Sequence, residues 1–220
     1  MIDAGQAKIC VAIEGEGPQA LMVHGFPESW YSWRHQMTPI TEAGVTAGAL
    51  DIRGYRGSQK FPEVAYYSME AIVADVLGVA DALSPDRPAV LVGHDWGAPI
   101  VYNTALIHPG RFTAVSALSV VYTGAPQRSS DIIIIIIKEM FDDKGVFFYQ
   151  SYFREPGRAE AMFDPNPRDF LRKFYYIGSG DGDIASLTAM AKTPDDALLD
   201  GMPDPDPFTA WLTDADLLRG

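Results

Sequence analysis

Four short apolar runs divide the first half of the sequence, and each stops abruptly at a glycine or a polar residue. They are residues 20–23, 47–50, 89–92 and 113–121. Short apolar runs bounded by turn residues are typical of strands that are buried on both faces of a sheet. Helical spacing fills the gaps, most clearly from Met69 to Leu83, with Ser68 as N-cap and Pro85 as stop. Strands that alternate with helices predict an α/β fold with a doubly wound, mostly parallel sheet.

The character of the sequence changes near residue 125. Before it, residues 8–13 predict a further strand, and a helix is expected to follow Gly97 and to end before Pro109. After it, strand signals fade and aromatic and Asp/Pro-rich sequence takes over. We therefore expect an α/β core over residues 1–124 and a mostly helical lid over residues 125–220. Ile132 to Ile137 are consecutive isoleucines, which indicate either a buried lid helix or an error in the sequence.

The charge balance limits the partners of the chain. The formal net charge is −12, so phosphate backbones and anionic lipid surfaces would be repelled, which argues against nucleic acid and membrane partners. Cys10 is the single cysteine, so no disulfide can form within the chain. The sequence also shows no secretory signal and no apolar run as long as a membrane span. We expect a cytoplasmic protein.

The segment Gly93-His94-Asp95-Trp96-Gly97 follows a buried run and opens a predicted helix. It has the form of a nucleophile elbow, a sharp turn in which small residues flank an exposed nucleophile. Because chemistry in parallel sheets gathers at the carboxyl ends of the strands, Asp95 is the candidate nucleophile. The alternative is that Asp95 only caps the following helix.

The segment His24-Gly25-Phe26-Pro27 follows an earlier strand, at the place where the oxyanion loop of such a fold belongs. The backbone N–H groups of Phe26 and Trp96 are then expected to converge on one oxygen. By itself the segment reads as a simple turn, since glycine and proline interrupt any loop. The two motifs together, each after a buried strand, favour a catalytic site.

With these motifs, the chain resembles the soluble, plant and bacterial epoxide hydrolases of the α/β-hydrolase fold. The resemblance runs from about residue 8 to residue 220, and the segments that carry it are 24–34, 51–58, 93–97 and 149–157. The last of them, in the lid, is the most specific. The resemblance implies that Tyr149 donates a proton to the epoxide oxygen, that the Phe26–Pro27 bond is cis and that Asp51 ties a turn. It also implies a substrate pocket lined by Phe26, Pro27, Trp96 and Gln150.

An aspartate at the elbow agrees with epoxide chemistry. A carboxylate that attacks an ester gives a reactive anhydride, whereas attack on a saturated carbon gives a stable ester. Water can later cleave that ester at the carbonyl carbon of Asp95 and release a vicinal diol, with the oxyanion hole holding the developing charge. The expected partners are a small apolar epoxide and water. No metal or cofactor is implied, because His, Cys and carboxylates do not cluster at ligand spacing, and homo-oligomerisation stays open.

A water-activating histidine and its acid partner are expected after the lid of this family. The chain has four histidines, His24, His35, His94 and His108, and none follows residue 108. We therefore expect a C-terminally truncated chain that lacks the last strands, alkylates Asp95 once and does not turn over. His94 should turn its side chain away from the pocket, and His35 and His108 should be surface or structural residues.

Two other functions remain open. A haloalkane or haloacid dehalogenase uses the same aspartate elbow, and Trp96 could hold the halide, but Phe26 stands where a second halide donor is usual. A catalytically inactive binding protein of the same fold is the other alternative, and the intact elbow, loop and lid tyrosine argue against it. An esterase is the least favoured, because the elbow lacks Ser or Cys.

Overall fold

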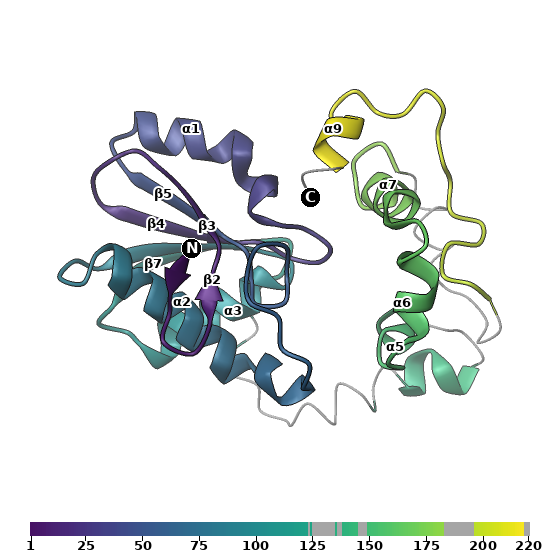
Figure 1. Ribbon diagram of the computed structural model, residues 1–220, viewed down its shortest axis with the longest axis horizontal. Coiled ribbons are helices and arrows are strands. Elements are labelled where there is room, and N and C mark those ends of the chain that lie inside the picture. The colour runs from purple at the N-terminus through teal and green to yellow at the C-terminus, as the bar shows by residue number, and fades with distance from the viewer. Residues whose placement is uncertain (123, 125–134, 136–137, 145–148, 183–195, 218–220) are drawn as a thin grey trace. The chain divides into compact units, whose positions relative to one another are not determined.

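The computed structural model describes residues 1–220 except 123, 125–134, 136–137, 145–148, 183–195 and 218–220 (Figure 1). Its contacts divide the chain into two compact units, residues 1–123 and residues 124–219. The first unit holds the sheets, and the described elements of the second unit are helices.

A five-stranded sheet forms the centre of the first unit, in the order β3-β5-β4-β6-β7. The strands are β3 (Val11–Glu14), β4 (Gln19–Val23), β5 (Thr46–Leu50), β6 (Ala89–His94) and β7 (Phe112–Leu118). The last four run parallel, and β3 pairs antiparallel with β5 at the edge. This confirms the predicted α/β fold with its mostly parallel sheet. The carboxyl ends of β4, β5 and β6 therefore lie side by side.

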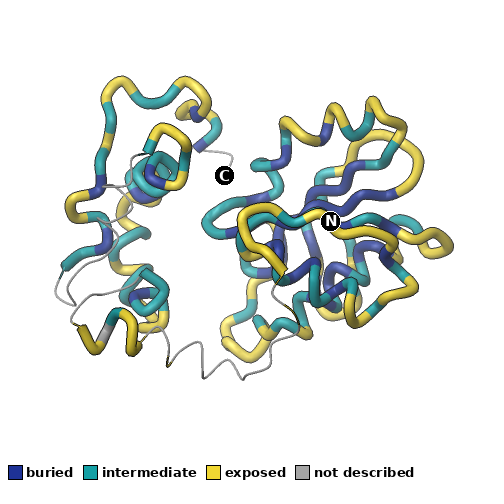
Figure 2. The backbone as a smooth tube through the Cα atoms, turned by 180° about the vertical axis from the view of Figure 1, so that it is seen from behind, coloured by how far each residue is buried: buried dark blue, intermediate teal, exposed yellow. Residues whose placement is uncertain are grey.

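Helices cover both faces of this sheet. The helix α1 (Arg34–Glu42) packs on one face, where Met37 contacts the cluster around Met22. The helices α2 (Met69–Leu83) and α3 (Gly97–Ile107) pack on the other face, against Leu21 and Val23. Successive side chains of a strand point to opposite faces, so both faces of β4 are buried, as the dark blue strands of Figure 2 show. Short 3-10 helices, η1 (Trp30–Trp33) and η2 (Val64–Tyr67), precede α1 and α2.

Element ends follow local chemistry. The Ser68 side chain accepts a hydrogen bond from Ala71 N and so caps α2, as predicted. Strand β6 continues two residues beyond the predicted 89–92 and leads directly into the Asp95 turn. Strand β7 ends at Leu118, earlier than the predicted residue 121, because Ser119 takes a left-handed φ of 70° that interrupts an extended strand.

The prediction of one strand over residues 8–13 was wrong. Strand β2 (Lys8–Ile9) pairs with β1 (Ile2–Asp3) in a separate sheet, and β3 begins at Val11. Cys10 separates β2 from β3 because its backbone is bound by the turn after β5. Its N–H donates to Ser58 Oγ at 2.8 Å, and its carbonyl accepts from Asp51 N at 2.9 Å.

Aromatic side chains pack the second unit together. Its described helices are η3 (Asp142–Lys144), α5 (Tyr149–Tyr152), α6 (Arg158–Phe163), α7 (Pro167–Ile177) and α9 (Asp214–Leu217). The rings of Phe163 and Phe170 stack with centroids 3.8 Å apart, which joins α6 to α7. The Asn166 side chain caps α7 by accepting from Asp169 N.

The structure describes Ile135 of the isoleucine run, with 48% of its surface exposed. The other residues of 132–137 lie outside the described residues, so the two explanations of this run stay predictions. Within the described part of the chain, every helix is too short or too polar to cross a membrane.

Candidate active site

Asp95 lies in the tight turn that joins β6 to α3. Its φ is +51°, a left-handed conformation that costs a residue other than glycine about 1–3 kcal/mol. Gly93 and Gly97, on the two sides of Asp95, let neighbouring backbone segments approach the turn closely. A Cβ on Gly93 would lie 2.3 Å from the carbonyl oxygen of Gly97, and a Cβ on Gly97 would lie 2.1 Å from that of Val23. The turn thus has the geometry of an elbow, and the N-cap of α3 is Trp96 rather than Asp95.

The loop after β4 reaches the carboxylate of Asp95. The backbone N–H of Phe26 donates to Asp95 Oδ1 at 2.9 Å. This approach depends on Gly25, because a Cβ there would lie 2.4 Å from Asp95 Cβ and 2.6 Å from Oδ1. The Phe26–Pro27 peptide bond is cis, as the resemblance implied. Trp96 follows Asp95 directly and is 53% exposed, and its role as second oxyanion donor stays a prediction.

His24 is a buried structural residue beneath this loop. Ile52 N donates to its Nε2 at 3.0 Å, so Nδ1 must carry the proton, which it donates to the carbonyl of Gly25 at 2.7 Å. Burial lowers the pKa of His24 below its ordinary value. Both ring nitrogens are therefore engaged in holding the loop, and the imidazole is neutral.

Glu28 and His94 form an ion pair beside Asp95. Glu28 Oε2 lies 2.9 Å from His94 Nδ1 and also accepts from Gly25 N at 3.1 Å. Burial alone would raise the pKa of Glu28, but the hydrogen bond and the charge of His94, with the Gly25 N–H, hold it below its ordinary value. The hydrogen bond to Glu28 raises the pKa of His94 against its partial burial. Glu28 was not among the predicted site residues, although a Glu three residues after Gly25 is a local signal for this backbone contact.

The turn after β5 supports the same loop. The fully buried Asp51 accepts from Trp30 N at 2.8 Å and from Gly57 N at 3.4 Å, which agrees with its predicted turn-tying role. Tyr55 packs edge-on against His24, with ring centroids 4.8 Å apart. Burial, followed by the charges of Asp95 and Glu28, raises the pKa of Tyr55 to about 12. Tyr55 therefore stays protonated near Asp95, and it was not among the predicted site residues.

A buried ion pair fastens that turn to α2. Arg53 donates to both carboxylate oxygens of Asp75, at 2.6 and 2.7 Å, and its side chain is 1% exposed. It also donates to the carbonyls of Tyr66, at 2.5 Å, and Ala71, at 2.9 Å. The sequence gives no local signal of this pair, because Asp75 is a single acidic residue within an ordinary amphipathic helix pattern.

The remaining predicted site residues lie in the second unit. Tyr149 and Gln150 begin α5, and Gln150 Nε2 donates to the Tyr149 hydroxyl at 3.3 Å. The Tyr149 ring packs against Phe153 and Phe174, at centroid distances of 6.1 and 6.3 Å. This fixes the direction of the ring within its own unit. Its action on a substrate stays a prediction.

The other histidines and the acidic residues suggest no further centre. His35 is exposed on α1, and His108 ends α3 as its C-cap. Among the residues that the structure describes, no three His, Cys, Asp or Glu side chains are grouped so that they could hold a metal ion.

In sequence and in fold, the chain is similar to known epoxide hydrolases. Epoxide hydrolase A of Mycobacterium tuberculosis is 35% identical over 219 residues, which cover 99% of this chain and 66% of that protein. The bifunctional epoxide hydrolase 2 of Sus scrofa is 38% identical over 161 residues, covering 73% of this chain and 28% of that protein. A solved epoxide hydrolase from an endophytic Streptomyces superposes with a TM-score of 0.88 at 41% identity, covering 98% of this chain and 64% of that one.

This chain spans about two thirds of the length of the Mycobacterium and Streptomyces proteins, at 66% and 64%. The family model of the alpha/beta hydrolase fold matches residues 21–176, which include the loop after β4, the elbow and much of the second unit. The chain belongs to the alpha/beta hydrolase fold family.

Proposed function

We propose that this chain carries the nucleophile and the proton donor of an epoxide hydrolase that acts on small apolar epoxides. The observation that carries the proposal is the hydrogen bond from Phe26 N to Asp95 Oδ1, at 2.9 Å, on a left-handed elbow. Support comes from relatives named epoxide hydrolases, at 35% and 38% identity. Phe26, Pro27, Trp96 and Gln150 would line the substrate pocket.

In the first step, the Phe26 amide holds Asp95 Oδ1 and leaves Oδ2 to attack. A bond forms between Oδ2 and one epoxide carbon, while the bond between that carbon and the ring oxygen breaks. The electron pair of the broken bond stays on the oxygen, which takes the hydroxyl proton of Tyr149. A phenol suits this transfer because an alkoxide is far more basic than a phenolate. The product is a 2-hydroxyalkyl ester of Asp95.

In the second step, water adds to Asp95 Cγ, and negative charge develops on Oδ1. That is the atom that Phe26 N already binds, so the oxyanion site is formed before the substrate arrives. The Trp96 amide would be the second donor. Collapse of the adduct breaks the bond between Asp95 Cγ and the ester oxygen, which releases the vicinal diol and restores the Asp95 carboxylate. Of the two protons of the water, one ends on the departing diol oxygen and the other restores the Tyr149 phenol.

The second step also needs a base to take a proton from water. His24 has both ring nitrogens engaged, and His94, the residue before Asp95 at the elbow, would turn its side chain away from the reacting ester. Neither is suited to this task. We therefore expect the 220-residue chain to accumulate the ester rather than to turn over.

Incubation with styrene oxide, followed by intact-mass measurement, tests the proposal. We expect one equivalent of the whole epoxide to add, because no atom leaves in the first step. Tyr149→Phe should slow the addition by about 10²-fold, the usual contribution of a positioned acid. The matched control Tyr176→Phe, on α7 of the same unit, should leave the rate unchanged.

A parallel incubation with 1-bromobutane separates the dehalogenase alternative. An epoxide hydrolase should give no butyl ester, whereas a dehalogenase should add a butyl group and release bromide. Bromide release without any epoxide adduct would contradict the proposed function.

A further inference from the structure

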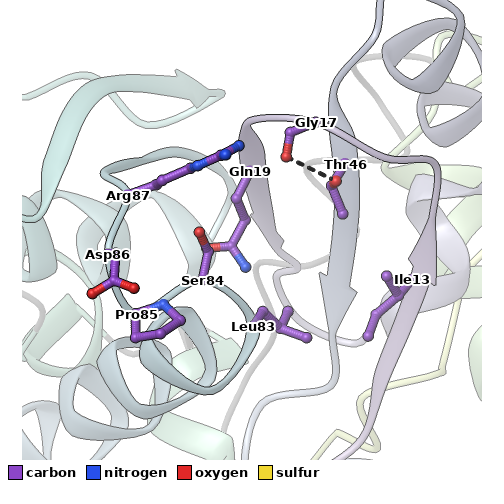
Figure 3. A pocket seen from close by; sticks show the side chains of 9 residues that line it. All are labelled: Ile13, Gly17, Gln19, Thr46, Leu83, Ser84, Pro85, Asp86 and Arg87. Carbon is purple, nitrogen blue, oxygen red and sulfur yellow. Dashed lines mark hydrogen bonds between the residues drawn. The ribbon is translucent and has the colours of Figure 1, made fainter.

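A cleft of 440 Å³ opens at the amino ends of the central strands (Figure 3). It lies where β4 and β5 begin and where α2 ends, and its lining includes Gln19, Thr46, Leu83 and Ser84. Asp95 follows the carboxyl end of β6, which runs parallel to β4. The cleft and Asp95 are therefore about one strand length apart, roughly 16 Å for five residues. The cleft is separate from the candidate active site.

Gln19 is the unusual residue of this cleft. Its side chain is buried, with 3% of the residue exposed, yet neither Nε2 nor Oε1 finds a hydrogen-bond partner among the described residues. It shares a face of β4 with Leu21 and Val23, which pack into the apolar core against α2. In Figure 3 its side chain extends from the strand toward the end of α2.

A buried amide without partners is costly, and folded proteins satisfy almost all such groups. The amide of Gln19 offers an N–H donor and a C=O acceptor side by side. A second amide is complementary to it, because its carbonyl accepts from Nε2 while its N–H donates to Oε1. A carboxylate would satisfy Nε2 and place an anionic oxygen near Oε1. An ammonium group would satisfy Oε1 alone.

The walls of the cleft are held in place by hydrogen bonds of their own. Arg111 donates to the carbonyl of Ser84 at 2.7 Å and to that of Arg87 at 2.5 Å, which fixes the segment after α2. Thr46 Oγ1 donates to the carbonyl of Gly17 at 3.1 Å, so its hydroxyl proton is already used within the protein and is not offered to a ligand (Figure 3). The Gln19 amide is therefore the lining group that a ligand would supply with hydrogen-bond partners.

The rest of the lining indicates a neutral ligand with an apolar part. Leu83, Ile13 and Pro85 contribute apolar surface. Asp86 and Arg87 are exposed and carry opposite charges, so the rim favours neither anions nor cations strongly.

We propose that this cleft binds a small neutral molecule with a planar amide or lactam edge and an apolar body, held by paired hydrogen bonds to Gln19. The site does not depend on the chemistry proposed for Asp95.

An NMR titration of the 15N-labelled chain with benzamide tests this proposal. Benzoate and benzylamine, which share the phenyl body, form the comparison arms. We expect benzamide to shift the Gln19 side-chain amide resonances saturably, and benzoate and benzylamine to bind at least tenfold more weakly. The Gln19 resonances are assigned by their loss in Gln19→Leu.

Gln19→Leu should weaken benzamide binding at least tenfold, measured on the backbone resonances of Leu83 and Ser84. The matched control Gln36→Leu, at an exposed position of α1, should leave the dissociation constant unchanged. Gln19→Glu, which keeps the shape and removes the N–H donor, should weaken it as well. Unmoved Gln19 resonances, or benzoate binding as tightly as benzamide, would overturn the proposal.

Discussion

Phe26 and Asp95 are 69 residues apart in sequence, and the amide of the first donates to Oδ1 of the second at 2.9 Å. The contact arises because β4 and β6 are parallel neighbours, so the loops that follow them lie together. It distinguishes the two carboxylate oxygens: a backbone donor holds Oδ1, and Oδ2 is the oxygen that attacks in the proposed reaction.

Gly25→Ala should slow ester formation at Asp95 about tenfold or more, since a misplacement of about 1 Å in a reacting group can cost about 10²-fold. The added Cβ would lie 2.6 Å from Asp95 Oδ1, so the carboxylate must move away from Phe26 N. The rate of mass gain with styrene oxide measures the effect. Gly110→Ala, where a Cβ meets nothing within 4 Å, is the control. Equal rates for the two variants would show that the contact does not matter.

Gly97→Ala should lower the free energy of unfolding by about 2–3 kcal/mol, as expected for an overpacked site. Its Cβ would lie 2.1 Å from the carbonyl of Val23, and that backbone atom cannot yield as a side chain would. Urea unfolding followed by circular dichroism measures the loss. A loss below about 0.5 kcal/mol, the range of neutral surface changes, would mean that α3 and β4 are not packed as described.

Asp75→Ala should lower the free energy of unfolding by about 3–5 kcal/mol, because it leaves the buried Arg53 guanidinium without its counter-charge. Asp81→Ala removes the partner of Arg111, where Asp81 is 52% exposed, and should cost less than about 1 kcal/mol. Urea unfolding of the two variants side by side gives the comparison. Similar losses in both would contradict the buried position of the Arg53–Asp75 pair.

The pKa values of His24 and His94 should be shifted in opposite directions from the ordinary value of 6.5. The Glu28 hydrogen bond raises the pKa of His94, so its stabilisation is complete below pH 6.5 and is lost as the pH rises through the higher folded value. Burial lowers the pKa of His24, so the stability it supports is complete above pH 6.5 and is lost as the pH falls toward the lower folded value.

NMR titration of the imidazole resonances checks both directions. Glu28→Gln should bring the pKa of His94 back down, because it removes the negative partner. A pKa of His24 above 6.5, or a pKa of His94 that Glu28→Gln leaves unchanged, would contradict the assigned contacts.

Local pattern was sufficient for β4, β5 and β6 and for α2 and α3, because strand burial and capping residues such as Ser68 leave a direct mark in the sequence. It failed at Cys10, where the backbone is bound by Ser58, 48 residues away. It also failed at Ser119, whose left-handed φ of 70° has no signal in residue type. Both errors come from contacts or conformations that periodicity does not encode.

The candidate site was predicted where motifs are short and contiguous, as in residues 24–27 and 93–97. Its supports were missed because they join distant segments. The clearest case is Glu28 with His94, 66 residues apart. Likewise, the buried and unpartnered Gln19 amide becomes apparent only when the surroundings of the side chain are known.

The location of the styrene oxide adduct tests the central claim most directly. Peptide mapping by tandem mass spectrometry after a single incubation should place the added mass on Asp95, and Asp95→Asn should abolish it while the protein stays folded. Cys10 is the natural competitor as a nucleophile, but its partial burial, followed by the nearby Asp51 carboxylate, raises the pKa of its thiol. An adduct on Cys10 or on another carboxylate, or one that survives Asp95→Asn, would show that Asp95 is not the nucleophile.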